Sequence, residues 1–176
     1  VYGPYDVSTQ FNLPDPVRMT GIDFNYKQAL TFLPHALRGV QVFANATMLR
    51  LTGADAAAAS MVGYVPRTYN WGVSLTRPTF VLRAGWNYSG ERKTSSLQTG
   101  RGLEPGTFQW KPQSLKIDVQ GEYYFWRRVA AFANFRNLTG ATEYTGIYGP
   151  NTPGFARLRQ RDDYGSSWTF GVKSTF

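Results

Sequence analysis

The residues best suited to bind a ligand lie in one polar stretch near the C-terminus. This stretch is rich in Gly and Pro, yet it also carries aromatic rings and charged groups. Its candidate ligand-binding residues are Tyr144, Tyr148, Arg157, Arg159 and Arg161. Arginine can bind anionic groups bidentately, and aromatic rings stack on sugars or catecholates. The stretch is therefore the candidate substrate-binding site, and solvation of a loop or contact with lipopolysaccharide phosphates is the competing interpretation.

The usual groups of a catalytic or metal site are scarce in this chain. There is no Cys, and the one His, His35, lies in an expected turn with no Ser or Asp paired to it. A catalytic triad or a histidine metal site needs several such groups held together. Asp118 and Glu122 alternate with Lys116 on one strand face, which predicts ion pairs along that face. We expect no enzymatic activity, no cofactor and no metal.

Seven segments must position these residues, and each alternates apolar with polar side chains. The segments cover approximately residues 22–32, 40–49, 69–76, 80–88, 115–125, 129–136 and 167–176. A period of two predicts strands that have one apolar and one hydrated face. Phe43, Leu49 and Phe132 break the pattern, because they fall on the polar parity. The fold class is all-β.

The connections between the seven segments alternate strictly in length. Those at about 33–39, 77–79 and 126–128 are short turns, whereas those at about 52–68, 89–114 and 138–166 are long loops. A compact soluble domain has no reason to place every long loop at one end. Outer-membrane barrels do so, with short periplasmic turns and long extracellular loops. No apolar run is long enough for a spanning helix, so only a closed barrel could cross a bilayer.

Aromatic residues on the apolar parity form two groups at the expected ends of the strands. The outer group is Tyr69, Trp71, Trp86, Tyr88, Phe135 and Trp168. The inner group is Phe32, Phe80, Phe125 and Phe176. Two such bands are typical of the aromatic girdles of a membrane barrel.

The C-terminal strand resembles the end of bacterial outer-membrane β-barrel proteins. Trp168, Phe170, Val172 and Phe176 lie on one face, and the chain ends on the last of them. In those proteins this pattern is a membrane-insertion signal for the barrel-assembly machinery, and Ser174 departs from it where an aromatic is usual. The net charge of +8 is scattered through turns and loops, which favours contact with lipopolysaccharide phosphates over nucleic acid.

From Gly21 to Phe176 the chain resembles the C-terminal third of the TonB-dependent outer-membrane receptors. The segments that carry the likeness are Gly21–Phe24, Leu33–Gly39, Val42–Thr47, Val65–Arg67, Trp86–Arg92 and Phe135–Thr139. Asp23 stands where the family usually has Glu, and Ala46 where it often has an aromatic. The resemblance implies a transmembrane antiparallel barrel of about 22 strands with a plugged lumen, of which these are the last seven.

This resemblance also implies a function and a location. Residues 1–176 would be the C-terminal part of one barrel domain, with 1–20 mostly extracellular loop and the plug domain absent. The parent protein would import a scarce solute, such as a metal–siderophore chelate or an oligosaccharide, and contact TonB through its missing N-terminal part. The C-terminus would lie on the periplasmic side of the outer membrane. The alternatives are a passive porin and a soluble β-sandwich adhesin.

Overall fold

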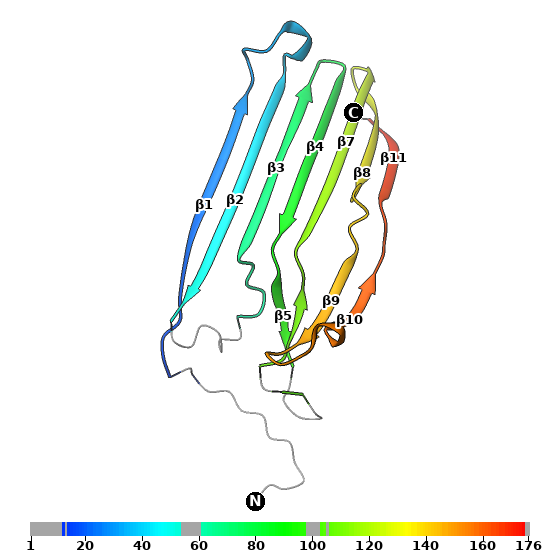
Figure 1. The fold of residues 1–176 in the computed structure, drawn as a ribbon. Helices are drawn as coiled ribbons and strands as arrows, with labels where there is room; N and C mark the ends of the chain where they lie inside the picture. Colours follow the sequence, from blue (N-terminus) through cyan, green and yellow to red (C-terminus); the bar gives the residue numbers. More distant parts are fainter. Residues whose placement is uncertain (1–11, 13, 54–60, 98–102, 105, 175–176) are drawn as a thin grey trace, which may run out of the picture.

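The computed structural model describes residue 12 and residues 14–53, 61–97, 103–104 and 106–174. These residues form eleven β-strands in two antiparallel sheets, together with two short 3₁₀ turns, so the expected all-β class is confirmed (Figure 1). No helix among them has the length and apolar character needed to cross a membrane.

The larger sheet consists of the seven expected strands. They are β1 (Arg18–Ala29), β2 (Val40–Thr52), β3 (Arg67–Thr76), β4 (Phe80–Ser89), β7 (Ser114–Trp126), β8 (Val129–Arg136) and β11 (Ser167–Ser174). Their order in the sheet is their order in the chain, so each strand pairs with the one before and the one after it. Within the described residues the sheet is open, because β1 and β11 are its two edges and do not pair with each other. The first strand begins at Arg18, earlier than expected.

Short and long connections lie at opposite ends of this sheet, as the sequence predicts. The three short turns are at one end, where β1 meets β2, β3 meets β4 and β7 meets β8 (Figure 1). The 3₁₀ turn η1 (His35–Leu37) belongs to the first of them, and the Arg77 Nη2 donates a hydrogen bond of 2.9 Å to the His35 carbonyl. His35 is exposed and lies in this turn.

Two of the long connections were expected to be structureless loops, and this was wrong. They contain β5 (Arg92–Ser96), β6 (Phe108–Lys111), β9 (Glu143–Tyr148) and β10 (Leu158–Asp162), with η2 (Gly154–Ala156) between the last two. The order of this second sheet, β10-β9-β6-β5, repeats the order β11-β8-β7-β4 of the strands that lead into it. The second sheet therefore extends the hairpins of the first (Figure 1).

The three residues that break the alternating pattern all cover glycines of the neighbouring strand. The pairs are Phe43 over Gly72, Phe132 over Gly171 and Leu49 over Gly21. A Cβ added to any of these glycines would lie within 2.6 Å of the covering side chain. An aromatic or aliphatic side chain that covers a cross-strand glycine restores packing which the glycine cannot provide. The exceptions are therefore part of the sheet's own packing.

The apolar face of the seven-stranded sheet is not covered by other described residues. Among them only Phe108 and Ala130 are buried hydrophobic residues, whereas Ile22 is 73% and Val172 67% exposed. The two sheets follow one another along the strand direction and are not stacked face to face (Figure 1). A β-sandwich needs two facing sheets with a core between them. The described part of the chain has no such core.

Rings of the expected aromatic bands do meet across strands on this face. Tyr69 stacks on Tyr88 at 5.4 Å between ring centroids, and Trp71 stacks on Trp86 at 6.3 Å. Phe135 contacts the rings of Trp168 and Phe170, each at 5.6 Å. Of the inner band, Phe80 and Phe125 lie in β4 and β7, Phe32 lies in a turn, and Phe176 falls outside the described residues.

Candidate functional site

A row of asparagines crosses the polar face of the large sheet. Asn25, Asn45, Asn70 and Asn87 are successive cross-strand partners on β1 to β4, and Lys116 on β7 continues the row. All five have the polar parity of their strands, so their side chains share one face. Each amide offers both hydrogen-bond donors and acceptors. The four asparagines are a neutral surface that can bind hydroxyl or carbonyl groups, and Lys116 adds a positive charge at one end.

The row ends in a hollow at the junction of the two sheets. Its volume is about 290 Å³. The hollow is lined by residues of six strands and of the links beside them: Thr68, Asn70, Asn87, Tyr88, Ser89, Arg92, Lys111, Pro112, Gln113, Ser114, Lys116, Thr142, Glu143 and Tyr144. Because β5, β6 and β9 belong to the second sheet, the hollow exists only where both sheets meet.

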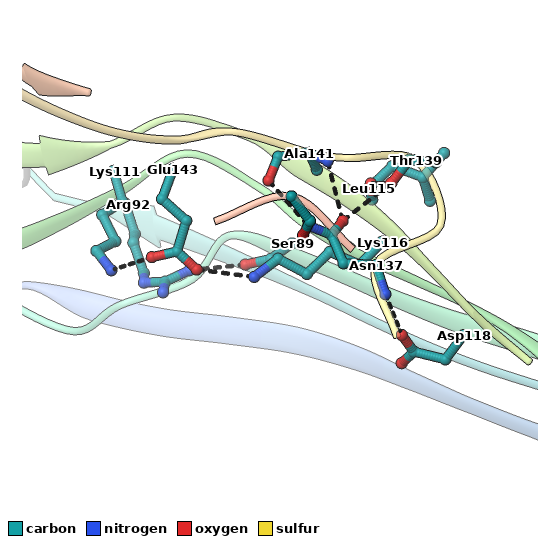
Figure 2. A network of polar contacts seen from close by, with 11 residues as sticks. Ser89, Arg92, Lys111, Leu115, Lys116, Asp118, Asn137, Thr139, Ala141 and Glu143 are labelled. Carbon is teal, nitrogen blue, oxygen red and sulfur yellow. Dashed lines mark hydrogen bonds and ion pairs between the residues drawn. The ribbon is translucent and has the colours of Figure 1, made fainter. Parts of the chain in front are cut away.

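Charged groups in this hollow converge on one carboxylate. Glu143 on β9 accepts hydrogen bonds from the Lys116 ammonium at 2.8 Å and the Lys111 ammonium at 3.4 Å (Figure 2). The bond from Lys116, followed by the charges of both lysines, lowers the pKa of Glu143 below its ordinary value. Arg92 adds a third cation, and its Nη1 donates to the Ser89 Oγ at 2.8 Å. With three cations and one carboxylate, the lining is net positive.

Asn137 holds the point where β8 ends and the second sheet begins. Its φ of 53° is in the left-handed region, which Asn tolerates better than most residues. Its side chain donates to the carbonyls of Ala141 and Gly165, at 3.2 and 3.0 Å, and accepts from the Ala141 N–H at 2.9 Å (Figure 2). Its own N–H donates to Asp118 at 2.9 Å. One residue therefore ties β7, β8 and the chain before β11 together.

The expected ion pairs along β7 are not the ones that form. Lys116 pairs with Glu143 instead of Asp118, whose carboxylate accepts from Asn87 and Asn137. Glu122 pairs with Lys173 at 2.7 Å, across the intervening β8. Neither pair joins adjacent strands, because Lys116 reaches β9 of the second sheet and Lys173 reaches past β8. Partners on other strands therefore replace partners on the same strand.

The structure brings together four of the five predicted ligand-binding residues, as two ring–cation pairs. Tyr144 and Tyr148 lie on β9, and the Arg157 guanidinium lies 5.0 Å from the Tyr148 ring. Arg161 on β10 lies 5.6 Å from the Tyr144 ring. Arg159 lies at the register shift between Leu158 and Gln160 and is exposed. Its grouping with the other four is not seen.

Two rings and a lysine that the sequence analysis did not select join this cluster. Trp110 stacks on Tyr148 at 4.9 Å with an interplanar angle of 4°, and its Nε1 donates to the Tyr148 carbonyl at 3.2 Å. Lys93 lies 4.1 Å from the Phe108 ring centroid and 5.6 Å from that of Trp110. The alternation of Phe108, Gln109 and Trp110 could have predicted a short strand, although three residues are a very short pattern.

Tyr148 also forms a polar contact with the residue that precedes β5. Its hydroxyl donates a hydrogen bond to the Glu91 carboxylate. Burial, and then this bond, raises the pKa of the Tyr148 hydroxyl well above its ordinary range. The phenol is therefore a neutral donor at physiological pH, and its ring contacts Trp110 and the Arg157 guanidinium.

Three residues of the expected insertion signal are on one face of the edge strand β11. Trp168, Phe170 and Val172 are 63%, 64% and 67% exposed. Phe176, the fourth, lies outside the described residues. Among the residues that are described, no three His, Cys, Asp or Glu side chains come together as a metal site requires.

Comparison of the chain with protein-family models, with curated proteins and with solved structures finds no match.

Proposed function

We propose that this chain is the C-terminal part of the β-barrel of a TonB-dependent receptor in the bacterial outer membrane. The parent protein would import a scarce solute, such as a metal chelate or an oligosaccharide. The observation that carries this proposal is the seven-stranded up-and-down sheet, which has an uncovered apolar face and a polar face opposite it. Short turns at one end and extended hairpins at the other support the same architecture.

The uncovered apolar face needs an apolar solvent. Burial of apolar surface contributes about 25 cal/mol per Å². Large side chains such as Ile22, Leu82 and Phe170 are exposed on this face, and no described residues cover them. Acyl chains would solvate them without a second layer of protein. The rings of Tyr69, Trp71 and their partners would then lie at the boundary between lipid and water.

The two open edges support a larger closed sheet. β1 and β11 each leave one side of a long strand unpaired within the described residues. Such edges promote aggregation in water and do not occur in the hydrocarbon region of a membrane. Further strands of the parent barrel would pair with both edges, and the barrel-assembly machinery would bind the C-terminal strand. We expect that residues 1–176 alone do not fold.

The polar face would line the solute pathway. The asparagine row and the positive hollow are on this face, at the end where the long hairpins extend. A solute that enters from outside would meet the hollow first and the amide row next. In the proposed parent protein, TonB acts through the plug, which this chain does not contain.

Single-cysteine labelling tests the membrane assignment. This chain has no Cys, so each introduced cysteine is the only thiol within residues 1–176. In cells that make the full-length protein, Leu82→Cys and Phe170→Cys should resist a membrane-impermeant maleimide. Their strand neighbours, Arg83→Cys and Thr169→Cys, should react once the pathway is open. Equal reactivity of both parities, or extraction of the protein by carbonate, would sink the proposal.

Active transport is tested separately from membrane insertion. Solute-dependent growth or uptake should require the full-length protein and should be lost when TonB is deleted. Uptake that survives the deletion would instead identify a passive channel with the same strand pattern.

A further inference from the structure

One face of the four-stranded sheet carries rings and cations in contact with one another. We call it the ring–cation surface, and its residues are Lys93, Trp110, Tyr144, Tyr148, Arg157 and Arg161. Each of the three cations lies over one of these aromatic rings, at 5.0 to 5.6 Å. Trp110 and Tyr148 form a parallel stack. Arg161 also pairs with Asp163 at 3.9 Å, and Tyr148 binds Glu91, so two carboxylates accompany the three cations. Rings flanked by a net positive charge suit a partner that has both sugar rings and phosphates.

The ring–cation surface lies on the side that continues the apolar face. Lys111 and Arg92 are cross-strand partners. Arg92 donates to Ser89 of the polar face. Lys111 pairs with Glu143, which also pairs with Lys116 of the polar face. Trp110 is the strand neighbour of Lys111, so it points to the opposite side. Tyr148 stacks on Trp110 and therefore shares that side. The rings of Trp110 and Tyr148 thus face away from the hollow and the asparagine row, whereas Tyr144, the strand neighbour of Glu143, also lines the hollow.

Exposed apolar side chains interleave with the arginines next to this surface. Phe155 is 91% and Leu158 59% exposed, and they flank Arg157. Apolar groups mixed with arginine are typical of protein segments at a membrane surface, where each cation near anionic headgroups contributes about 1 kcal/mol. This composition separates the region from the purely apolar face below it.

We propose that the ring–cation surface binds the phosphorylated sugar headgroup of lipopolysaccharide in the surrounding leaflet. The inference rests on the proposed outer-membrane location. If the apolar face contacts acyl chains, the sheet that extends it beyond the lipid boundary lies at headgroup level. Arg157 and Arg161 bind phosphates there, and the Trp110–Tyr148 stack packs against the sugar.

This assignment moves Tyr148, Arg157 and Arg161 from substrate binding to lipid binding, whereas Tyr144 borders both the ring–cation surface and the hollow. A solute in the pathway would contact the opposite face of the same sheet, where Arg92, Lys111 and Lys116 surround Glu143. The two faces of one small sheet would therefore bind different molecules.

The test measures lipopolysaccharide retained by the full-length protein after purification in detergent. In Arg157→Gln/Arg161→Gln, retention should fall roughly fivefold for each cation removed. Arg157→Lys/Arg161→Lys keeps the charge but not the planar guanidinium, so its retention should be intermediate. The matched control is Arg38→Gln/Arg128→Gln, which makes the same charge change at exposed sites on the far end of the sheet. The control should retain as much lipopolysaccharide as the unaltered protein.

Several outcomes would overturn the inference. They are unchanged retention in the Gln double variant, an equal loss in the control, and displacement of the lipid by inorganic phosphate alone. Heat-dependent mobility on gels verifies that each variant has a folded barrel, and the Lys variant keeps the test valid if the Gln variant fails to fold. Failure of the membrane assignment is detected separately by carbonate extraction, so the two proposals can fail independently.

Discussion

The two sheets are built from the same hairpins, yet they are stabilised differently. β1 and β2 pair over twelve residues without a register shift, and β3 and β4 are equally regular. In the four-stranded sheet two of the three pairings, β5 with β6 and β9 with β10, contain a shift. Of the six pairings of the larger sheet only that of β7 with β8 contains a shift, between Tyr124 and Trp126. The smaller sheet relies on stacked rings and on polar side chains at the junction.

The largest expected effect tests whether the apolar face of the large sheet and the exposed face of the second sheet contact different solvents. Leu82→Arg places a charge on the apolar face and should cost about 2–4 kcal/mol if that site lies near the middle of a bilayer. The matched variant Leu158→Arg, at an exposed site of the second sheet, should cost close to nothing. The measurement is the unfolding free energy of the full-length protein in lipid vesicles. Similar costs for both variants would mean that the two sheets share one solvent.

A second variant tests the junction itself. Asn137→Ala removes the side-chain bonds to Ala141 and Gly165 and leaves a left-handed backbone, so it should cost roughly 2–3 kcal/mol. Asn137→Gly loses the same bonds without the backbone strain and should cost less. Hydrogen exchange should show the loss of protection mainly in β9 and β10. Equal loss throughout the large sheet would contradict this division.

A third pair of variants tests the covered glycines within the large sheet. Gly72 and Gly85 are cross-strand partners, but only Gly72 lies beneath a ring, that of Phe43. A Cβ on Gly72 would meet the Ala84 carbonyl oxygen at 2.5 Å and Phe43 ring carbons at 2.6 Å, so Gly72→Ala should cost roughly 1–3 kcal/mol. Gly85→Ala meets nothing within 4 Å and should be nearly neutral. Denaturation of both variants in parallel provides the measurement, and a neutral Gly72→Ala would refute the covering role of Phe43.

The smallest expected effect depends on pH and concerns the hollow. The Glu143 pKa is lowered in the folded protein, so its stabilising contribution is present above the ordinary pKa and is lost as pH falls through the lowered pKa. Since Glu143 is 38% exposed, Glu143→Gln should cost less than about 1 kcal/mol at neutral pH. The variant should also flatten the acid dependence of the four-stranded sheet, followed by hydrogen exchange in β9. An unchanged acid dependence would exclude this contribution.

The alternation in the sequence predicts the large sheet well, because a period of two is a local property of each strand. The seven strands, their order and the alternation of short with long connections are as expected from residues such as Leu115, Ile117 and Val119. The second sheet was missed, because its strands are short and two of its pairings contain register shifts. Gly and Pro in these connections indicated loops, and a four-residue strand such as β6 leaves too few residues for a period to appear.

The candidate site was predicted only in part, for a related reason. The residue types of Tyr148 and Arg157 indicated a ring and a cation suited to binding, and the two do meet. Nothing local, however, places Trp110 against Tyr148 or both lysines against Glu143, since these partners are 27 to 38 residues apart in the chain.

The sequence alone determined that seven strands have one apolar and one polar face, since side chains on a strand must alternate whatever its partner is. Tertiary structure decided where the hollow forms and which side of the second sheet carries the rings. Both depend on cross-strand register and on the turn at Asn137, and these are set by distant segments of the chain.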